Sequence, residues 1–203
     1  MANKSQLAVQ KLQRPGEGAL VDVIRSSGPQ SHVLQFAANL SLVPVPDRRY
    51  PADVVSIVAD EHMVRLLFGQ RKIAGAGLRS LLVIHMTFDS IHQFLGSLET
   101  VEKKTTELLR KLPEGKLAKI DEEPQQTVAL AASIIVAGYS GAESCLDFYH
   151  TSPFSIQTVQ AGGKLALEPV VRITLPTSTF LAMWSSLKQL GPTLPSMAAE
   201  VTS

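Results

Sequence analysis

Alternating apolar and polar residues predict three β-strands in the first half of the chain. Residues 54–59 form a β-branched apolar run, and residues 60–62 then supply a polar turn. In residues 63–68 every second side chain is apolar, as expected of a hairpin partner with one buried face. A third alternating run over residues 81–86 follows a glycine-rich link, and residues 87–89 offer a helix cap.

The second half shows the same order of segments. Residues 132–137 are apolar, residues 139–141 supply the turn, and residues 143–149 and 170–175 give two further strands. The apolar positions of the second strand recur at an offset of 80, and those of the third strand recur at an offset of 89. The sequence therefore predicts an internal duplication.

A helix is predicted after the third strand of each half. Both helices carry one apolar stripe with the spacing i, i+3, i+4, i+7 and i+10, and the two stripes match at the offset of 89. The matched positions are Ile91, Phe94, Leu95, Leu98 and Val101 in the first helix and Phe180, Met183, Trp184, Leu187 and Leu190 in the second. Pro113 and Gly115 are expected to end the first helix, and Gly191 and Pro192 the second.

These patterns predict an α+β fold built from two related β-β-β-α units. Each unit has an antiparallel sheet with one amphipathic helix packed on one face, and the units pair edge to edge or pack face to face into one compact body. A mobile N-terminal arm with a short ordered turn near residues 20–24 is expected before them, and a loose tail after them. The expected boundaries are 1–30 for the arm, 31–115 for the first unit with a preceding strand over 33–45, 116–190 for the second unit and 191–203 for the tail.

The sheet face turned away from the helix differs between the halves. In the second half this face is mostly polar, but in the first half it is mostly apolar and needs a cover. The cover would be the second half, the strand at 33–45 or another copy of the chain, and a homodimer is the preferred assembly. The predicted interface residues are Met63, Arg65, Leu67, Leu81 and Val83.

Charge and composition restrict the classes of function. The 203 residues carry 19 basic and 18 acidic side chains, so a broad basic surface for nucleic acid is not expected. No apolar run is long enough for a membrane-spanning helix, and the N-terminal residues lack the pattern of a secretory signal. Cys145 is the only cysteine, which rules out an intramolecular disulfide and a cysteine-rich zinc site. A cytoplasmic location is expected.

The first half resembles a known family. Three segments precede an amphipathic helix, and they are Tyr50-Pro-Ala-Asp-Val-Val-Ser-Ile-Val, Val64-Arg-Leu-Leu-Phe-Gly-Gln and Leu82-Val-Ile-His-Met-Thr. Together they are similar to the bacterial domains labelled DUF3467. The resemblance covers about 50 residues of the first half and extends more loosely to the second. It implies no chemistry for any residue, because that family has no established activity.

Candidate reactive residues do not form a recognisable catalytic or metal site. The histidines His32, His62, His85, His92 and His150 lack metal-ligand spacing and are interpreted as ordinary surface or half-buried residues. Gly75 and Gly77 are followed by a strand, whereas a dinucleotide loop would be followed by a helix. Glu143 and Asp147 are four residues apart on one strand face, too far for a carboxylate pair, and Cys145 between them is interpreted as a structural cysteine. No catalytic residue, metal or cofactor is predicted.

The leading hypothesis is therefore a non-enzymatic module for protein–protein interaction, acting as a homodimer or as a subunit of a larger assembly. The alternative is a regulatory domain that binds a small ligand or nucleotide between the halves. The residues that would serve such a site are Gly75, Gly77, Arg79 and Arg172. An enzyme is the third and least favoured hypothesis.

Overall fold

The computed structural model describes residues 19–24, 35–37, 44–73, 77–109, 117, 127–151 and 165–195, with the backbone alone for 19–24, 35–37, 99–109, 139–140 and 165–166. The chain divides into two compact units. Unit 1 comprises Met1–Pro44 and Thr151–Glu168, and unit 2 comprises Val45–His150 and Pro169–Ser203. No helix in the described ranges is long and apolar enough to cross a membrane.

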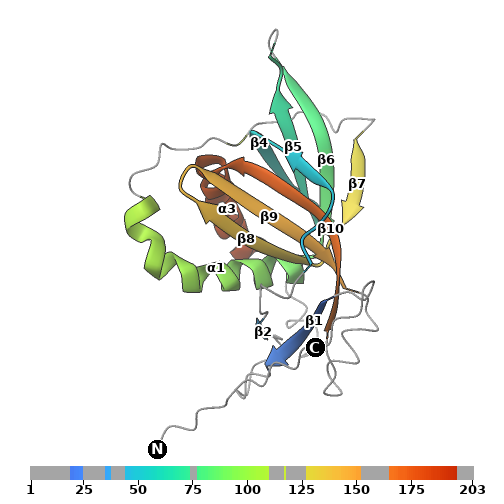
Figure 1. Cartoon of the computed structure of the whole chain (residues 1–203), viewed down its shortest axis with the longest axis vertical. Coiled ribbons are helices and arrows are strands. Elements are labelled where there is room, and N and C mark those ends of the chain that lie inside the picture. Colours follow the sequence, from blue (N-terminus) through green and yellow to red (C-terminus); the bar gives the residue numbers. More distant parts are fainter. Residues whose placement is uncertain are drawn as a thin grey trace, which may run out of the picture. The chain divides into compact units, whose positions relative to one another are not determined.

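Unit 1 contains a small antiparallel ladder (Figure 1). β1 (Ala19–Ile24) pairs with β2 (Gln35–Ala37) and with the first residues of β10 (Leu165–Pro176). A short turn was expected at the position of β1, and this segment is a strand instead. Most of the strand expected over residues 33–45 lies outside the described residues, apart from β2 and the last two positions.

The first sheet of unit 2 contains the three strands predicted for the first half of the chain. β4 (Val54–Ala59), β5 (Val64–Arg71) and β6 (Leu78–Met86) pair antiparallel in that order, and β4 has the predicted bounds. A fourth strand, β7 (Val128–Ala131), pairs parallel with β6 at the end of the sheet. We call this sheet 1.

The second sheet of unit 2 repeats this arrangement, and we call it sheet 2. β8 (Ile134–Ser140), β9 (Glu143–His150) and β10 follow one another across the sheet, with β8 and β9 antiparallel. The short strand β3 (Arg49–Pro51) pairs parallel with β10. Each sheet therefore receives its short parallel strand from the half of the chain that builds the other sheet.

The chain changes sheets at two bends, between β3 and β4 and between β7 and β8. Ala52 and Ala132 stand at these bends, and both are buried in the core. Each bend is held by two backbone hydrogen bonds, one to each sheet. They are Ala52 N to Thr174 O (2.8 Å), Asp53 N to Gly69 O (3.0 Å), Ala132 N to His85 O (3.0 Å) and Ser133 N to Tyr149 O (2.8 Å).

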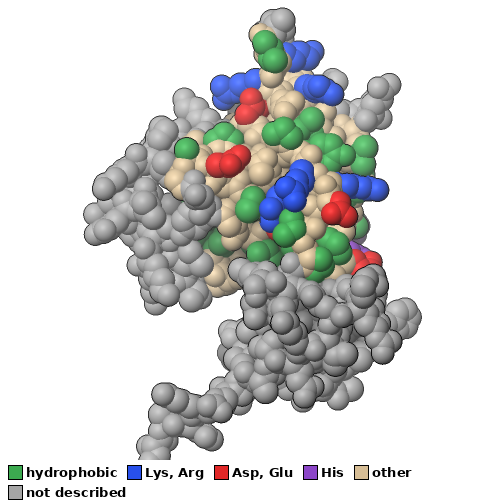
Figure 2. All heavy atoms as spheres, in the orientation of Figure 1, with side chains coloured by type: hydrophobic (Ala, Val, Ile, Leu, Met, Phe, Trp, Pro, Cys, Tyr) green, Lys and Arg blue, Asp and Glu red, His purple; other side chains and the backbone are tan. Residues whose placement is uncertain are grey.

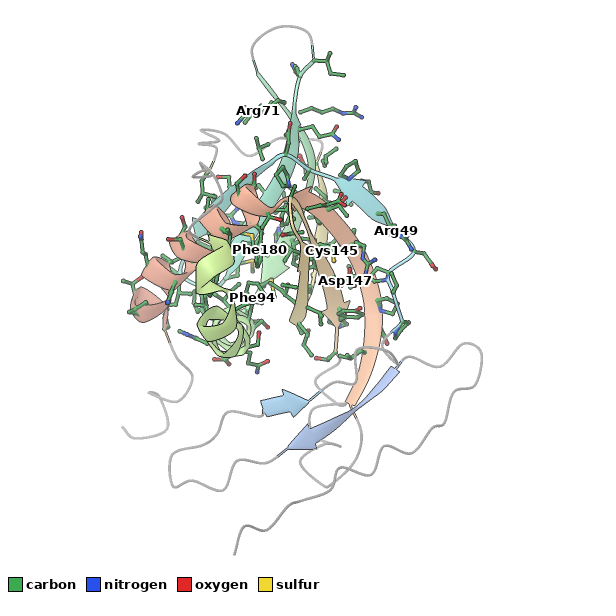
Figure 3. The ribbon with its side chains drawn as sticks, turned by 60° about the vertical axis from the view of Figure 1, so that its left-hand side comes forward. Arg49, Arg71, Phe94, Cys145, Asp147 and Phe180 are labelled. Carbon is green, nitrogen blue, oxygen red and sulfur yellow. The ribbon has the colours of Figure 1, made fainter. Side chains whose placement is uncertain are left out.

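In the described part of the chain, two helices pack against the two sheets. α1 (Phe88–Leu109) begins at Thr87, whose Oγ1 accepts a hydrogen bond from Ser90 N, so the predicted cap is confirmed. α3 (Thr177–Leu190) ends at Gly191, where a short 3-10 turn, η1 (Gly191–Thr193), follows. The helices contact each other, and Figure 3 shows them together on one side of the strands.

One hydrophobic core joins both halves. The inner faces of the two sheets meet at Phe68 and Phe148, whose rings are 5.8 Å apart and packed edge to face. The predicted helix stripes supply the rest of the core, including Ile91, Phe94 and Leu98 from α1 and Phe180, Met183, Trp184 and Leu187 from α3. Neither half has a core of its own, because apolar residues of both halves belong to the same cluster.

The predicted fold class is correct in outline, with mixed sheets and two helices among the described residues, but one detail is wrong. The sheets are not antiparallel throughout, because β3 and β7 pair parallel. Each helix also contacts the sheet of the other half, because α1 contacts β8, and α3 contacts β4 as well as β9 of its own half. Sequence patterns gave no sign of β3 or β7, since three or four residues are too few for an alternating pattern to be recognised.

Gly69 provides a test of the close packing inside sheet 1. A Cβ atom on Gly69 would lie 2.8 Å from Arg79 O and 3.2 Å from Val54 Cγ2. We predict that Gly69→Ala lowers the free energy of unfolding by about 1–3 kcal/mol, because the strands must move apart. Urea denaturation measures this. The control is Gly96→Ala on α1, where a Cβ meets nothing within 4 Å and the helix should gain up to about 1 kcal/mol. Equal stability of the two variants would contradict the prediction.

Candidate functional site

The residues predicted to form an interface lie on β5 and β6 of sheet 1 or next to β5, but Leu81 packs against the main core. Leu67 and Val83 face each other across β5 and β6 and are outside the main core cluster. Their side chains are only 3% and 2% exposed, so they are already buried within a single copy of the chain. Met63, Arg65 and Leu81 are half-buried. The outer face of sheet 1 therefore offers a second copy less apolar area than the sequence led us to expect.

The polar turn before β5 has a structural role. Asp60 Oδ1 accepts hydrogen bonds from His62 N (2.9 Å) and Met63 N (3.0 Å), and Asp60 Oδ2 pairs with Arg65 Nη2 at 3.1 Å. The two backbone hydrogen bonds are the main cause of a lowered pKa of Asp60. The ionised form is thus favoured in the folded state, and its contribution to stability is lost as the pH falls through this pKa. The interpretation of residues 60–62 as a hairpin turn is confirmed.

The outer face of sheet 2 carries an ion pair at the positions that correspond to Leu67 and Val83. Asp147 lies 80 residues after Leu67, and Arg172 lies 89 residues after Val83. Arg172 donates to both carboxylate oxygens of Asp147, through Nε and Nη2. The Asp147 side chain is 8% exposed and that of Arg172 is 23% exposed. One sheet thus has an apolar cross-strand pair where the other has a bidentate ion pair.

Tyr149 lies beside this ion pair. Its hydroxyl donates to Asp147 Oδ2 at 3.4 Å, and the side chain is buried. Burial raises the pKa of Tyr149 well above its ordinary value, and the negative charge of Asp147 raises it further, against the opposing effect of Arg172. The phenol therefore stays neutral and acts as a hydrogen-bond donor, not as a base.

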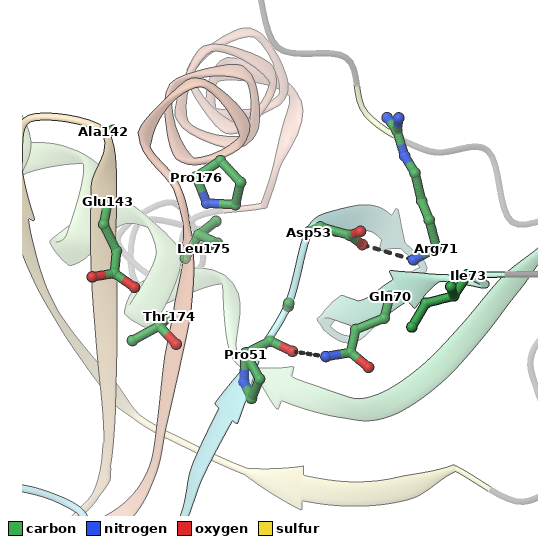
Figure 4. A pocket seen from close by; sticks show the side chains of 11 residues that line it. Pro51, Asp53, Gln70, Arg71, Ile73, Ala142, Glu143, Thr174, Leu175 and Pro176 are labelled. Atoms are coloured by element: carbon green, nitrogen blue, oxygen red, sulfur yellow. Dashed lines mark hydrogen bonds between the residues drawn. The ribbon is translucent and has the colours of Figure 1, made fainter.

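A pocket of about 480 Å³ opens near the first bend (Figure 4). Its wall includes the acidic side chains of Asp53 and Glu143, the hairpin residues Arg71 and Ile73, and apolar groups such as Leu175 and Pro176. Part of the polar lining is already engaged. Asp53 Oδ1 accepts a hydrogen bond from Arg71 N (2.8 Å) and Gln70 Nε2 donates to Pro51 O (2.8 Å).

The hairpin of β5 and β6 extends beyond the other strands of sheet 1 (Figure 1). Near its end Lys72 N donates to Gly77 O at 3.1 Å, and the φ angle of +133° at Gly77 suits glycine. Ile73 is fully exposed there. The basic residues Arg71, Lys72 and Arg79 are also exposed, and residues 70–80 contain no acidic side chain. Figure 2 shows apolar and basic side chains gathered at this end of the molecule. We call residues 71–79 the hairpin end.

The residues named for a ligand site are not brought together. Gly75 lies outside the described residues, while Gly77 and Arg79 belong to the hairpin end, on sheet 1. Arg172 lies on sheet 2, bound to Asp147, and the pocket wall includes none of these residues. In the described part of the chain, no group of three histidine, cysteine or carboxylate side chains has the arrangement of a metal site.

The ion pair between Asp147 and Arg172 is the feature that sequence reasoning missed. Both residues were placed on the same polar sheet face, but Arg172 was interpreted as a ligand donor. The missing step was to add the offsets of 80 and 89 to Leu67 and Val83, which gives Asp147 and Arg172 as the corresponding positions in the second half. That step places an acid opposite a base, which is a favourable cross-strand pair.

Comparisons with known proteins add no relative. No protein-family model matches the chain, and no curated protein is similar enough to count as a match. The resemblance to the DUF3467 domains therefore remains a prediction.

The two cross-strand pairs give a test of what the ion pair contributes. Asp147→Leu alone leaves Arg172 without its counter-charge, and we expect a loss of roughly 2–4 kcal/mol in the free energy of unfolding. The double variant Asp147→Leu and Arg172→Val copies the pair of sheet 1, and we expect it to recover most of that loss. Denaturant unfolding of both variants measures this. A double variant no more stable than the single one would show that the two positions are not interchangeable.

The raised pKa of Tyr149 gives a test in alkaline solution. In the folded protein this phenol should stay protonated near pH 10, where a tyrosine side chain in solution ionises, and the phenolate absorbance of Tyr149→Phe should differ from wild type only above that range. Because the pKa of Tyr149 is higher in the folded state than in the unfolded state, its contribution to stability is complete below about pH 10 and declines above it. A phenolate absorbance near pH 10 that is lower in folded Tyr149→Phe than in the folded wild type would contradict this.

Proposed function

We propose that the chain arose by tandem duplication of a strand–strand–strand–helix unit related to the DUF3467 domains. The offsets of 80 and 89 that relate the sequence patterns also relate the two pairs of hydrogen bonds at the bends. They relate the cross-strand pair of Leu67 and Val83 to that of Asp147 and Arg172 as well. Chance similarity between unrelated halves is a poor explanation, because the sequence patterns, the hydrogen bonds at the bends and the cross-strand pairs all agree with the same two offsets.

We propose that the protein is a non-enzymatic interaction module that binds other protein, as a homodimer or as a subunit of a larger assembly. The observation that carries this proposal is the hairpin end. A large apolar side chain that is fully exposed at the end of a projecting hairpin gains stability only when another surface covers it. The three cations around Ile73 favour a partner with acidic groups around an apolar depression.

A small-ligand function is the second candidate, and the pocket near the first bend supports it. Its volume is in the range of small-molecule sites, and apolar groups with a few polar ones line it. The wall carries both signs of charge, from Asp53 and Glu143 and from Arg71, and therefore suits either a cationic or an anionic ligand. A thermal-shift screen that includes amines and nucleotides would distinguish these classes, because a ligand well above its dissociation constant raises the melting temperature.

The hairpin end can be tested by binding. We expect Ile73→Ser to reduce the retention of partner proteins from a host extract by about tenfold, because a central apolar anchor commonly contributes more than 1 kcal/mol to an interface. Val45→Ser is the matched control, since Val45 is an exposed apolar residue outside the hairpin. Quantitative mass spectrometry of the retained proteins measures the difference. Equal retention by both variants would show that Ile73 is not a contact residue.

A further inference from the structure

The two short strands at the ends of the sheets occupy corresponding positions but have different open edges. Backbone groups alternate in direction along a strand. Ala132 N donates to His85 O on β6, so the backbone groups of Ala131 and Ala129 point away from β6. By the same reasoning, Ala52 N donates to Thr174 O on β10, and the groups of Pro51 point away from β10.

The open edge of β3 is blocked. Pro51 has no N–H to donate, and its carbonyl oxygen accepts a hydrogen bond from Gln70 Nε2 at 2.8 Å. The other outward position of β3 is Arg49, whose side chain is exposed and charged. Proline and charge are the usual means by which an edge strand is protected from pairing with another chain.

The open edge of β7 has none of this protection. Ala131 and Ala129 replace Pro51 and Arg49, so each outward position keeps an N–H and a carbonyl oxygen. Among the described residues β7 pairs only with β6, and in Figure 1 it lies at the border of sheet 1. The adjacent Val128 is 57% exposed. The strands at the opposite ends of the two sheets, β4 and β8, both contact a helix. β4 contacts α3 and β8 contacts α1.

We infer that β7 pairs with β7 of a second copy of this chain, antiparallel and about a two-fold axis at Leu130. Ala129 of one copy would then face Ala131 of the other, and four backbone hydrogen bonds would join two sheets into one. This inference rests on the proposed interaction function and assigns its homodimeric contact to β7, separate from the hairpin end.

Charge and symmetry favour a second copy as the occupant. Residues 124–142 contain no charged side chain, so two copies of β7 meet without repulsion between like charges. The blocked edge of β3 cannot accept β7 of a neighbour, so the contact closes as a dimer and does not continue as a filament. An acidic or basic strand of another protein would gain nothing from this uncharged edge beyond the backbone hydrogen bonds.

The test transfers the protection of β3 to β7. Ala131→Pro and Ala129→Arg place on β7 the residues that stand at the corresponding positions of β3. Sedimentation equilibrium of the full chain should give a dimer for wild type and a twofold lower mass for both variants. Val45→Arg adds a charge at an exposed residue that is not part of β7 and should remain dimeric. Circular dichroism confirms that each variant is folded.

A folded Ala131→Pro variant that remains dimeric would overturn the inference, and so would a wild-type protein that is monomeric at every concentration. If Ala131→Pro does not fold, hydrogen exchange of the wild type decides. The amides of Ala129 and Ala131 should be protected in concentrated solution and should exchange fast after dilution, whereas fast exchange at all concentrations would overturn the pairing. The hairpin end is tested separately by the Ile73→Ser variant. If the protein is a monomer and Ile73→Ser still loses its partner proteins, the pairing of β7 is wrong but the proposed interaction function is supported.

Discussion

The exchange of the short strands β3 and β7 is the interaction on which the rest of unit 2 depends. Each strand completes the sheet of the opposite half, and the following residues bend into the sheet of their own half. The bends need a small buried residue and two backbone hydrogen bonds, and Ala52 and Ala132 meet that need in the same way. A three-stranded sheet with one helix is only marginally stable alone. The exchange joins the two halves of the chain into one body with a common core.

The common core explains which differences between the halves the structure tolerates. Inner positions are apolar in both halves, since Phe68 and Phe148 must pack against each other. Outer positions have more freedom, and there the halves hold either Leu67 with Val83 or Asp147 with Arg172. An ion pair with bidentate geometry keeps its hydrogen-bonding groups satisfied, so it can replace an apolar pair without leaving an isolated charge in the sheet.

The two halves also differ in the strands and turns that they expose. β3 carries arginine and proline and is closed to further pairing, whereas β7 carries only small and apolar residues. The hairpin of β5 and β6 has an exposed isoleucine and three cations at its end, while the turn of β8 and β9 around Gly141 is short. We propose that the two halves carry different contacts, the contact with a second copy on β7 and the contact with another protein on the hairpin end.

The sequence by itself determined the longer strands, the two helices with their buried stripes, and the turn at Asp60. These elements follow from local periodicity and capping, which depend on residues that are close together in the sequence. Only the tertiary structure decided the partners of β3 and β7, because parallel pairing joins residues more than 40 positions apart and leaves no periodic trace in three or four residues. It also decided that Leu67 and Val83 are buried in a single copy and that Arg172 is held by Asp147. Burial and ion pairing depend on what lies across the sheet, and a residue's own neighbours in the chain do not specify that.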